Sequence, residues 1–565
     1  LSGVVALTLT PVLSAMILKS HEESQARRTF IGRFIDKFNV LFEMVTAKYG
    51  SLLQRIVSKR SVTFAMIGLF VAGIVVMAEL LPAGFIPNED QAMIYAIVQT
   101  PPGSTLERTN DISKRLQQIA EEIEGIDSVS SLAGYEILTE GRGSNAGTCL
   151  INLKHWSQRR HSVHEIIEEL EEKTHNIGAI VEFFEPPAVP GYGAAGGIAF
   201  RLLDKKPEID YQEFDRMNKM FIQKLKERKE LTGLFTFFAA NFPQYELEFD
   251  NERAMQKGVT LGKAMENLNI MIGSTYEQGF IRFGRFLKVY TQSLPEFRKL
   301  PSDVMKLFIK NEAGEMVPYS SFMSMKKTQG PNEITRYNMY TSAAIRAVPA
   351  PGYTTGDAIE AVSEVAKSTL PRGYDVAWEG LSYDEAGRGN EALYIFLVVL
   401  LFVYLVLSAQ YESFILPFSV MLSLPPGIYG SFLLLKGMGL ANDIYAQVGL
   451  IMLVGLLGKN AVLIVEFARQ REQQGFTIFN AAIEGAKVRF RPILMTSFAF
   501  IAGLIPLVIA TGPGAIGNRT IGASALGGML IGTVFGVIIV PGLYFIFAHL
   551  AKGENFIRGQ HKEPL

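Results

Sequence analysis

Residues 451–470 read IMLVGLLGKNAVLIVEFARQ, an apolar run with a single lysine, Lys459, near its middle. The run lies within an apolar segment over residues 445–467, and a helix needs about 20 such residues to cross the hydrocarbon core of a bilayer. Lys459 lies about nine residues before the charged end of this segment, or roughly 13 Å at the rise of an α-helix. The stretch therefore predicts a membrane-spanning helix with a cation deep inside it.

Further apolar segments lie on both sides of this helix. They cover residues 1–18, 62–81, 392–408, 414–435, 492–510 and 521–548. Residues 391–550 hold only 14 Asp, Glu, Lys or Arg, whereas the rest of the chain has the charge density of about 23% that is usual for soluble proteins. We therefore predict a membrane protein with a large soluble part. Residues 1–18 look like the end of a span whose beginning lies outside this sequence.

Lysine and arginine residues orient these spans. Residues 19–60 carry nine Lys or Arg against four Asp or Glu, and residues 468–491 carry five against two. Loops rich in Lys and Arg stay in the cytoplasm, so both loops are expected there and residues 85–390 are expected outside. Within the first loop, Phe30, Phe34 and Phe38 recur at helical spacing, which predicts an amphipathic helix at the membrane interface. An ordinary packed helix is the alternative.

A lysine at the depth of Lys459 needs a partner, because its insertion costs about 2.5–3.5 kcal/mol. No Asp or Glu lies at mid-depth in the other spans: Glu79, Glu391 and Asp443 lie at outer ends, and Glu466 lies nearer the cytoplasm. A carboxylate partner is therefore expected outside this chain. Two interpretations stay open, a structural ion pair and an intramembrane proton or ion relay, and we favour the relay.

The next span begins KVRFRPILMTSFAF at residues 487–500 and places Thr496 in its inner half. The simplest role of a threonine in a helix is a hydrogen bond to a carbonyl one turn back. Arg489 and Arg491 most simply anchor the helix at the inner interface.

The soluble part reads as two units of strands and helices. A strand at 92–98 and a helix that opens with a capping box, Ser104 and Glu107, begin the first unit. The unit continues with strands at 127–134 and 147–154, a helix at 163–176 and a strand at 180–185. This β-α-β-β-α-β order is that of a ferredoxin-like unit. A second unit is predicted from strands at 198–203, 245–249, 343–348 and 374–379 and helices at 210–228 and 356–369, interrupted by an insertion over about 250–335.

The stretch TEGRGSNAGTC at residues 139–149 is rich in glycine and lies between two predicted strands. It predicts either a flexible loop that gates a site or a plain long hairpin. It is not a phosphate loop, since it lacks the G-x-x-x-x-G-K-[ST] pattern.

Composition excludes several function classes. Lys plus Arg number 54 and Asp plus Glu number 55, so no basic surplus indicates nucleic acid. The only cysteine, Cys149, excludes an intrachain disulfide and a thiolate zinc site, and the histidines and methionines show no metal-ligand spacing. No nucleophile-elbow or zincin motif is present, so we expect no enzyme activity, no bound metal and no cofactor.

Motifs along nearly the whole chain resemble resistance-nodulation-division (RND) exporters of the hydrophobe/amphiphile, or AcrB-like, branch. They are GLLGKNAVLIVEFA (455–468), RFRPILMTSFAFIAGLIPL (489–507), ALTLTPVLSAMIL (6–18), GFIPNEDQ (84–91), QTPPGSTLERT (99–109), GRGSNAG (141–147) and LSAQYESFILPFSVMLSLPPGIYG (407–430). The chain looks like the C-terminal half of such a protein.

The resemblance implies a homotrimeric, multi-pass inner-membrane drug/proton antiporter of a Gram-negative bacterium. It would contact membrane lipid, export amphiphilic small molecules and work with a periplasmic adaptor protein and an outer-membrane channel. The implied fold is a membrane helical bundle plus an α+β periplasmic domain with ferredoxin-like subdomains. The expected regions are the end of a span (1–18), an interfacial helix (19–61), a span (62–84), a first porter subdomain (85–195), a second one (196–240 with 338–390), a docking lobe (241–337), five spans (391–550) and a cytoplasmic tail (551–565).

The resemblance also assigns roles to single residues, position by position. Lys459, Thr496 and Arg489 match the proton relay, whose aspartates belong to the other half of the family's sequence. The gating loop matches Leu138, Gly141, Arg142 and Gly143. The substrate pocket matches Tyr95, Leu132, Ile137, Thr139 and Leu150.

Two alternatives to a drug exporter remain. One is a transporter of the same architecture for another substrate class, such as a metal ion or a lipid. The other is a membrane protein that transports nothing, which would have no use for a lysine inside the membrane.

Overall fold

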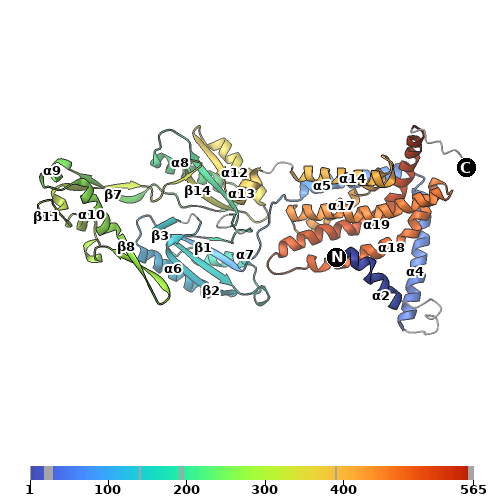
Figure 1. The fold of residues 1–565 in the computed structure, drawn as a ribbon, viewed down its shortest axis with the longest axis horizontal. Coiled ribbons are helices and arrows are strands. Elements are labelled where there is room, and N and C mark those ends of the chain that lie inside the picture. The colour runs from blue at the N-terminus through green and yellow to red at the C-terminus, as the bar shows by residue number, and fades with distance from the viewer. Residues whose placement is uncertain are drawn as a thin grey trace.

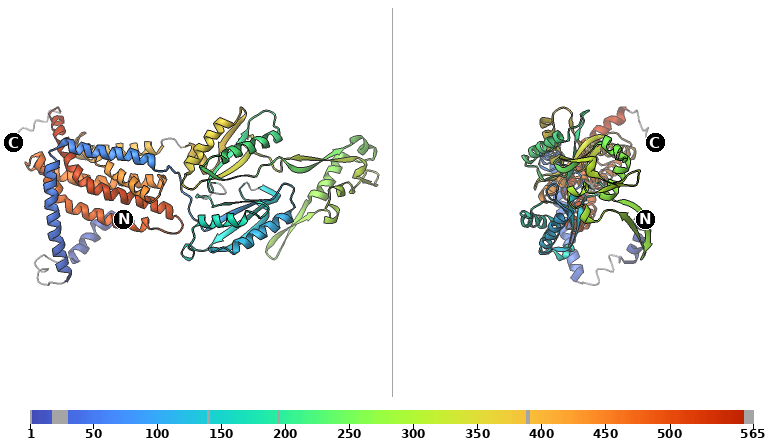
Figure 2. Two further views of the ribbon diagram at one scale, coloured as in Figure 1. Left: turned by 180° about the vertical axis from the view of Figure 1, so that it is seen from behind. Right: turned by 90° about the vertical axis from the view of Figure 1, so that its left-hand side faces the viewer.

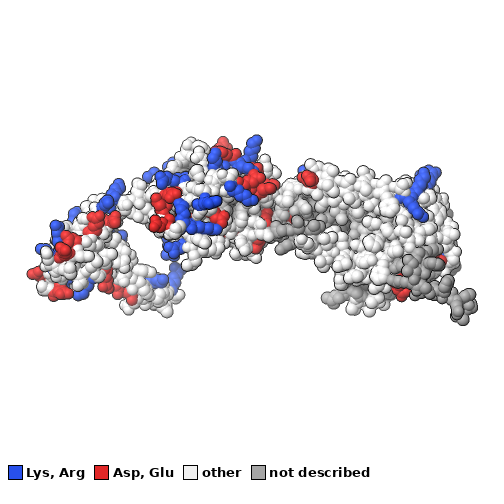
Figure 3. Space-filling view, turned by 90° about the horizontal axis from the view of Figure 1, so that it is seen from above, with Lys and Arg blue, Asp and Glu red and all other residues white. Residues whose placement is uncertain are grey.

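The computed structural model describes residues 2–17, 30–138, 141–189, 191–192, 196–387 and 391–557. The molecule is elongated, with a helical bundle at one end, two units of sheet and helix in the middle and a smaller lobe at the far end (Figure 1). Both chain termini lie at the helical end (Figure 2). Charged side chains cover the sheet-containing half, whereas the visible face of the bundle is almost free of them (Figure 3).

Six stretches of helix within the described residues are long and apolar enough to cross a membrane. They are α5 (Arg60–Leu80), α14 (Glu391–Tyr411), α15 (Pro417–Met421) together with α16 (Pro425–Gly437), α17 (Ile444–Gln473), α18 (Ile478–Val508) and α19 (Ala515–Ile557). Each span expected from residue 62 onward falls on one of them. The span expected at 414–435 is divided, because prolines start both α15 and α16, where a missing backbone N–H is tolerated.

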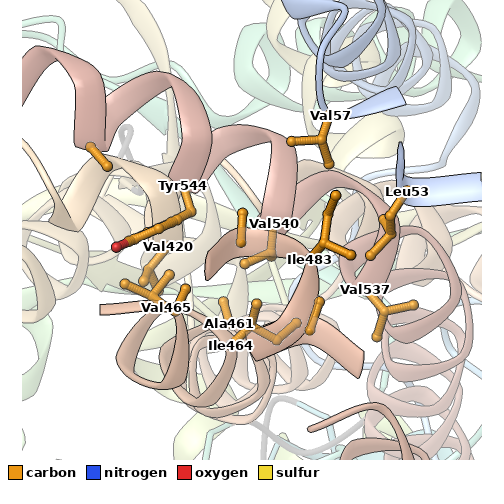
Figure 4. Close-up of a cluster of buried hydrophobic side chains, with 14 of the residues drawn as sticks. Leu53, Val57, Val420, Ala461, Ile464, Val465, Ile483, Val537, Val540 and Tyr544 are labelled. Atoms are coloured by element: carbon orange, nitrogen blue, oxygen red, sulfur yellow. The ribbon is translucent and has the colours of Figure 1, made fainter. Parts of the chain in front are cut away.

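The described residues before the first loop form two short helices, α1 (Ser2–Leu7) and α2 (Leu9–Ile17). They are followed by α4 (Phe30–Ile56), which runs across one end of the bundle (Figure 1). The Tyr49 ring stacks on Phe490 with 4.3 Å between centroids, and its hydroxyl donates to the Val537 carbonyl over 2.6 Å. Leu53 and Val57 belong to the same buried hydrophobic cluster as Tyr49, Phe490 and Val537 (Figure 4).

Only part of the apolar surface of α4 is covered by the bundle. Phe38, Leu41 and Val45 remain exposed and are free to meet lipid.

The helices α16 and α19 approach each other closely through two glycines. A Cβ atom on Gly430 would lie 2.4 Å from the Gly527 carbonyl oxygen, and one on Gly527 would lie equally close to the Gly430 oxygen. Beside them, the hydroxyls of Ser431 and Ser524 are 2.7 Å apart and share a hydrogen bond. Small residues at a helix interface allow the backbones to come this near inside a membrane.

The first sheet-containing unit has the predicted order of elements. It consists of β1 (Met93–Gln99), α6 (Leu106–Glu121), β2 (Ile126–Glu136), β3 (Gly141–Leu153), α7 (Val163–Thr174) and β4 (Ile180–Phe184). The strands lie in the order β2-β3-β1-β4, and all neighbours are antiparallel. Ile94, Ala96 and Val98 point from β1 into a core beneath α6 and α7, so the opposite face of the sheet is not covered by its own helices.

The expected capping box of α6 is wrong by one residue. Thr105 is the N-cap, and its hydroxyl accepts a hydrogen bond from the Arg108 backbone N–H over 3.3 Å. Ser104 is buried instead.

The second unit has a five-stranded sheet. It is built from β5 (Ile198–Asp204), α8 (Tyr211–Lys226), β6 (Leu231–Thr236), β13 (Thr335–Tyr337), β14 (Tyr340–Pro349), α12 (Thr355–Thr369) and β15 (Tyr374–Trp378), with α13 (Leu381–Gly387) leading to the bundle. The strand expected at 245–249 exists, but it is not part of this sheet. Its place is taken by β6, which pairs with β14.

That strand belongs instead to the far lobe. Strands β7 (Phe242–Phe249) and β12 (Met323–Gly330) form an antiparallel ribbon that leads from the second unit into the lobe. The lobe adds α9 (Asn251–Gln256), α10 (Leu261–Leu268), α11 (Pro301–Val304), β10 (Phe308–Lys310) and β11 (Met316–Pro318) around its own small core. It also carries a hairpin of β8 (Thr275–Arg282) and β9 (Arg285–Thr291), most of whose side chains are exposed.

Candidate functional site

Lys459 lies near the middle of α17 and its side chain is exposed. Neighbours on the same helix, Val454 and Leu457, face the interior of the bundle. Within the described residues, no hydrogen bond or ion pair reaches the Lys459 ammonium group. The side chain is therefore presented on an open side of the bundle, where a partner from another segment could approach it.

Thr496 lies on α18 and is exposed as well. Its hydroxyl donates to the Ile493 carbonyl over 3.0 Å, the local bond that is usual for a threonine in a helix. That bond is available without any partner from another helix.

The residues that follow Lys459 and Thr496 in the sequence face inward and contact each other. The Asn460 side-chain amide donates to the Ser497 hydroxyl over 3.0 Å, and the Thr533 hydroxyl donates to the same oxygen over 3.1 Å. This buried network joins α17, α18 and α19. Sequence reasoning missed it, although three polar residues in long apolar helices were a signal that could have been used.

A small cavity lies beside this network. Its polar lining comes from Ser423, Asn460 and Thr533, and the remaining lining residues are apolar. Hydroxyl and amide groups in one small cavity are the kind of partners that an ordered water requires.

Arg489 does not reach a carboxylate in the described part of the chain. Its guanidinium carbon lies 3.5 Å from the centroid of the Phe467 ring, on α17, in a cation–π contact. Arg491 donates to the Asn39 side-chain oxygen over 2.9 Å and so ties α18 to α4. The anchoring role expected for Arg491 therefore takes the form of a contact with α4.

Three residues predicted for the substrate pocket lie on the uncovered face of the first sheet. Tyr95 and Leu150 are direct neighbours on β1 and β3, and Leu132 lies on β2 with 45% of its side chain exposed. Ile137 packs instead in a small apolar cluster between the two units. Thr139 lies outside the described residues.

The predicted gating loop is largely a hairpin. Leu138 is buried among Ile97, Phe184 and Phe235, whereas Gly141 begins β3, in which Arg142 pairs with Tyr135 on β2. From Gly141 onward the structure agrees with the hairpin alternative rather than with a flexible loop, because the strand ladder extends through the glycines.

Gly143 marks a close approach of the two units. A Cβ atom there would lie 2.9 Å from the Asn332 side-chain nitrogen, so a larger residue would require the Asn332 side chain to move.

A larger cavity, partly open to solvent, lies between the two units. Its lining residues are Gln99, Pro102, Asn145, Phe237, Phe238, Ala239, Phe242, Asn332, Glu333, Thr335 and Ala344. None of the predicted pocket residues is among them. Two of its three phenylalanines, Phe237 and Phe238, come from the aromatic run FTFF at 235–238, and phenylalanines around a few amide groups suit an apolar ligand with a polar end.

Glu182, on β4, lies where the first unit meets β6 of the second. Burial raises its pKa to about 7, and the charge of Glu171 adds to this. Because the folded protein keeps the Glu182 carboxyl protonated, the stability of the folded state is greatest below about pH 4.5, the ordinary pKa of a glutamate. This stability falls as the pH rises from 4.5 through 7. Glu182→Gln should therefore stabilise the soluble half at pH 8, by about 1–3 kcal/mol, and leave it nearly unchanged at pH 4.5.

Thermal unfolding followed by tryptophan fluorescence measures this effect, because both tryptophans, Trp156 and Trp378, lie in the two units. Glu246→Gln, at an exposed glutamate on β7, is the matched control. An equal melting temperature for Glu182→Gln and the unmodified chain at pH 8 would show that burial of Glu182 has no energetic consequence.

Comparison with known proteins places this chain in a family. Residues 1–548 match the model of the AcrB/AcrD/AcrF family. The chain is 37% identical to the multidrug/solvent efflux pump membrane transporter MepB of Pseudomonas putida over 551 residues, which are 97% of this chain and 52% of MepB. It is 35% identical to multidrug resistance protein MdtF of Escherichia coli K12 over 560 residues, 97% of this chain and 53% of MdtF.

The multidrug export protein AcrF of the same Escherichia coli strain is 34% identical over 565 residues, which cover 98% of this chain and 54% of AcrF. The chain thus spans about half the length of the curated relatives it matches. The relatives are efflux transporters rather than enzymes. On the match over nearly its whole length, the chain belongs to the AcrB/AcrD/AcrF family of RND efflux transporters.

Proposed function

We propose that this chain is the C-terminal half of a proton-driven pump that exports hydrophobic or amphiphilic small molecules. The observation that carries the proposal is Lys459, a lysine in the middle of a membrane helix that the bundle leaves exposed and that has no described partner. A cation in that position is costly unless a carboxylate approaches it. The curated relatives are about twice as long, so the other half of such a protein has room for that carboxylate.

Proton coupling follows from the charge balance at Lys459. The lysine is stabilised by an ionised carboxylate and loses that stabilisation when the carboxylate binds a proton. Proton binding and release would then move the Lys459 side chain between partners. Because Asn460 and Ser497 tie α17 to α18, such a movement would be shared by both helices.

The soluble units supply the path for the exported molecule. We infer that both are ferredoxin-like, since each contains antiparallel strands with two helices on one face. The cavity between them, with Phe237, Phe238 and Phe242 beside amide groups, suits an amphiphile. The uncovered sheet face with Tyr95, Leu132 and Leu150 would form a second part of the path. The predicted gating loop, from Leu138 to Gly143, would separate this sheet face from the cavity.

The assembly that we propose is a homotrimer in the inner membrane of a Gram-negative cell. Residues 85–390 would lie in the periplasm, where the far lobe would meet an outer-membrane channel through an adaptor protein. Export of a metal ion or a lipid by the same architecture is the alternative.

Expression in cells that lack their own efflux pumps tests the proposal. The chain alone should give no drug resistance, whereas co-expression with the segment that corresponds to the first half of its relatives should raise the inhibitory concentration of amphiphilic drugs. Resistance from the 565-residue chain alone would contradict the two-half account. No resistance to any amphiphile from the combined halves, with both in the membrane, would contradict the export function.

A further inference from the structure

Residues 82–92, which we call the strap, connect α5 to β1 and contact the outer ends of two other membrane helices. At its start, the strap runs beside the residues that precede α17. The Asn442 N–H donates to the Pro82 carbonyl over 2.9 Å, and the Ile444 N–H donates to the Phe85 carbonyl over 3.1 Å. The first part of the strap is thus fixed to the helix that carries Lys459.

Glu89 fixes the strap to a second helix. One carboxylate oxygen of Glu89 accepts the Gly517 N–H over 2.7 Å, and the other accepts the Ile516 N–H over 3.2 Å. Both donors belong to the first turn of α19, where backbone N–H groups have no partner within the helix. A carboxylate at this end also interacts favourably with the helix dipole.

Asp90, the next residue, fixes the strap to the first soluble unit. Its carboxylate forms an ion pair with Arg159, whose side chain is only 3% exposed. The Trp156 indole N–H donates to the Asp90 backbone oxygen over 3.2 Å. Trp156 and Arg159 lie in the connection between β3 and α7, so Asp90 holds that part of the first soluble unit.

Neighbouring acidic residues therefore hold two different bodies, Glu89 a membrane helix and Asp90 a soluble sheet. We propose that Glu89 and Asp90 are positioning residues that transmit displacement of α19 to the first soluble unit. This inference rests on the proposed function for its role in export, but the mechanical link itself is a property of this chain.

The connection from α19 through Glu89 and Asp90 to the first soluble unit is short. Glu89 and Asp90 are consecutive, with Cα atoms about 3.8 Å apart, so a shift of the start of α19 beyond what rotation of the Glu89 side chain absorbs must move Asp90 unless the Glu89 bonds break. Arg159 in turn cannot release Asp90 cheaply, since its charge would remain buried without that partner.

Two spin labels measure the link directly in the 565-residue chain. The label sites are Asn518 on α19 and Lys114 on α6, both exposed. We expect one narrow distance distribution in the parent chain and a broader or shifted one in Glu89→Ala. Glu89→Gln keeps an oxygen that can accept one N–H, so the width of its distance distribution should lie between those of the parent chain and Glu89→Ala. This variant replaces the alanine variant if the latter does not fold. An unchanged distribution in both variants would overturn the proposal.

Asp210→Ala is the matched control. Asp210 also accepts two backbone N–H groups at the start of a helix, α8, but it lies inside the second unit. Its loss should leave the distance between the labels unchanged. Broadening as large as that of Glu89→Ala would show a general loosening of the chain and would overturn the link.

Export by the two halves together provides the second readout. Glu89→Ala should lower the maximal export rate by about twofold to thirtyfold, while the amphiphile concentration for half-maximal export and the amount of assembled protein stay the same. Full export despite a broadened distance distribution would overturn transmission. If the parent protein exports nothing, the proposed function fails, and the distance distributions alone decide whether the strap links the two bodies.

Discussion

Lys459→Met is expected to abolish proton-driven export by the complete protein while the assembled protein remains in the membrane. Methionine has a similar length and is apolar, so it removes the charge with little change in packing. Lys459 is exposed on α17 and makes no hydrogen bond or ion pair with another described residue, so its loss should leave the packing of the bundle intact. Efflux of a fluorescent amphiphile from energised cells measures the loss, with the oligomer content determined separately.

Lys436→Met is the matched control. Lys436 is an exposed lysine at the outer end of α16 that donates to the Leu80 carbonyl over 2.7 Å, and export should survive its loss. Thr496→Ala should impair export less than Lys459→Met, since the Thr496 hydroxyl is exposed, among the described residues bonds only the Ile493 carbonyl of its own helix, and can be replaced by water. Normal efflux in Lys459→Met would remove this residue from the mechanism. Loss of the oligomer in that variant would instead assign Lys459 a structural ion pair.

Gly527→Ala is expected to destabilise the bundle by about 1–3 kcal/mol, the usual cost of forcing one extra carbon into a packed interface. The added Cβ would meet the Gly430 carbonyl oxygen at 2.4 Å, a distance that requires α16 and α19 to separate. Their separation would also break the hydrogen bond between Ser431 and Ser524. The midpoint of denaturant unfolding in detergent micelles measures the effect.

Gly536→Ala tests the same substitution on the same helix without the close contact. A Cβ on Gly536 would meet no atom within 4 Å, so this variant should be neutral or more stable by up to about 1 kcal/mol, since alanine favours a helix over glycine. Equal unfolding midpoints for the two variants would show that the approach of α16 to α19 is not tight.

Local sequence patterns predicted the membrane-spanning helices and, apart from α13, β6 and β13, the helices and strands of the two soluble units, because apolar length and alternation depend only on neighbouring residues. In the far lobe they predicted only β7. Strand β6 was not predicted, because LTGLFT is short and is interrupted by a glycine, Gly233. In the structure Gly233 has a left-handed conformation, with φ of +56°. The alternation of polar and apolar residues in QYELEF, residues 244–249 of β7, predicted a strand. It could not show that this strand pairs with β12 in the far lobe rather than with the second sheet.

The candidate site was predictable only in part. A lysine in an apolar run drew attention to Lys459, since its cost inside a membrane is a property of one residue. The bonds of Glu89 to the start of α19 join residues more than 400 positions apart, and no local pattern indicates them. The cavity between the two units likewise depends on how they pack, so its phenylalanines were not separable from ordinary core residues.

The most direct test of proton-driven export is proton movement measured together with amphiphile movement in liposomes that contain the two halves of the protein. A pH gradient is imposed, and two dyes report the internal pH and the amphiphile. We predict that the amphiphile accelerates dissipation of the pH gradient, that the gradient drives amphiphile transport, and that Lys459→Met abolishes both effects. Amphiphile transport that continues at the same rate after a protonophore has collapsed the gradient would contradict the account.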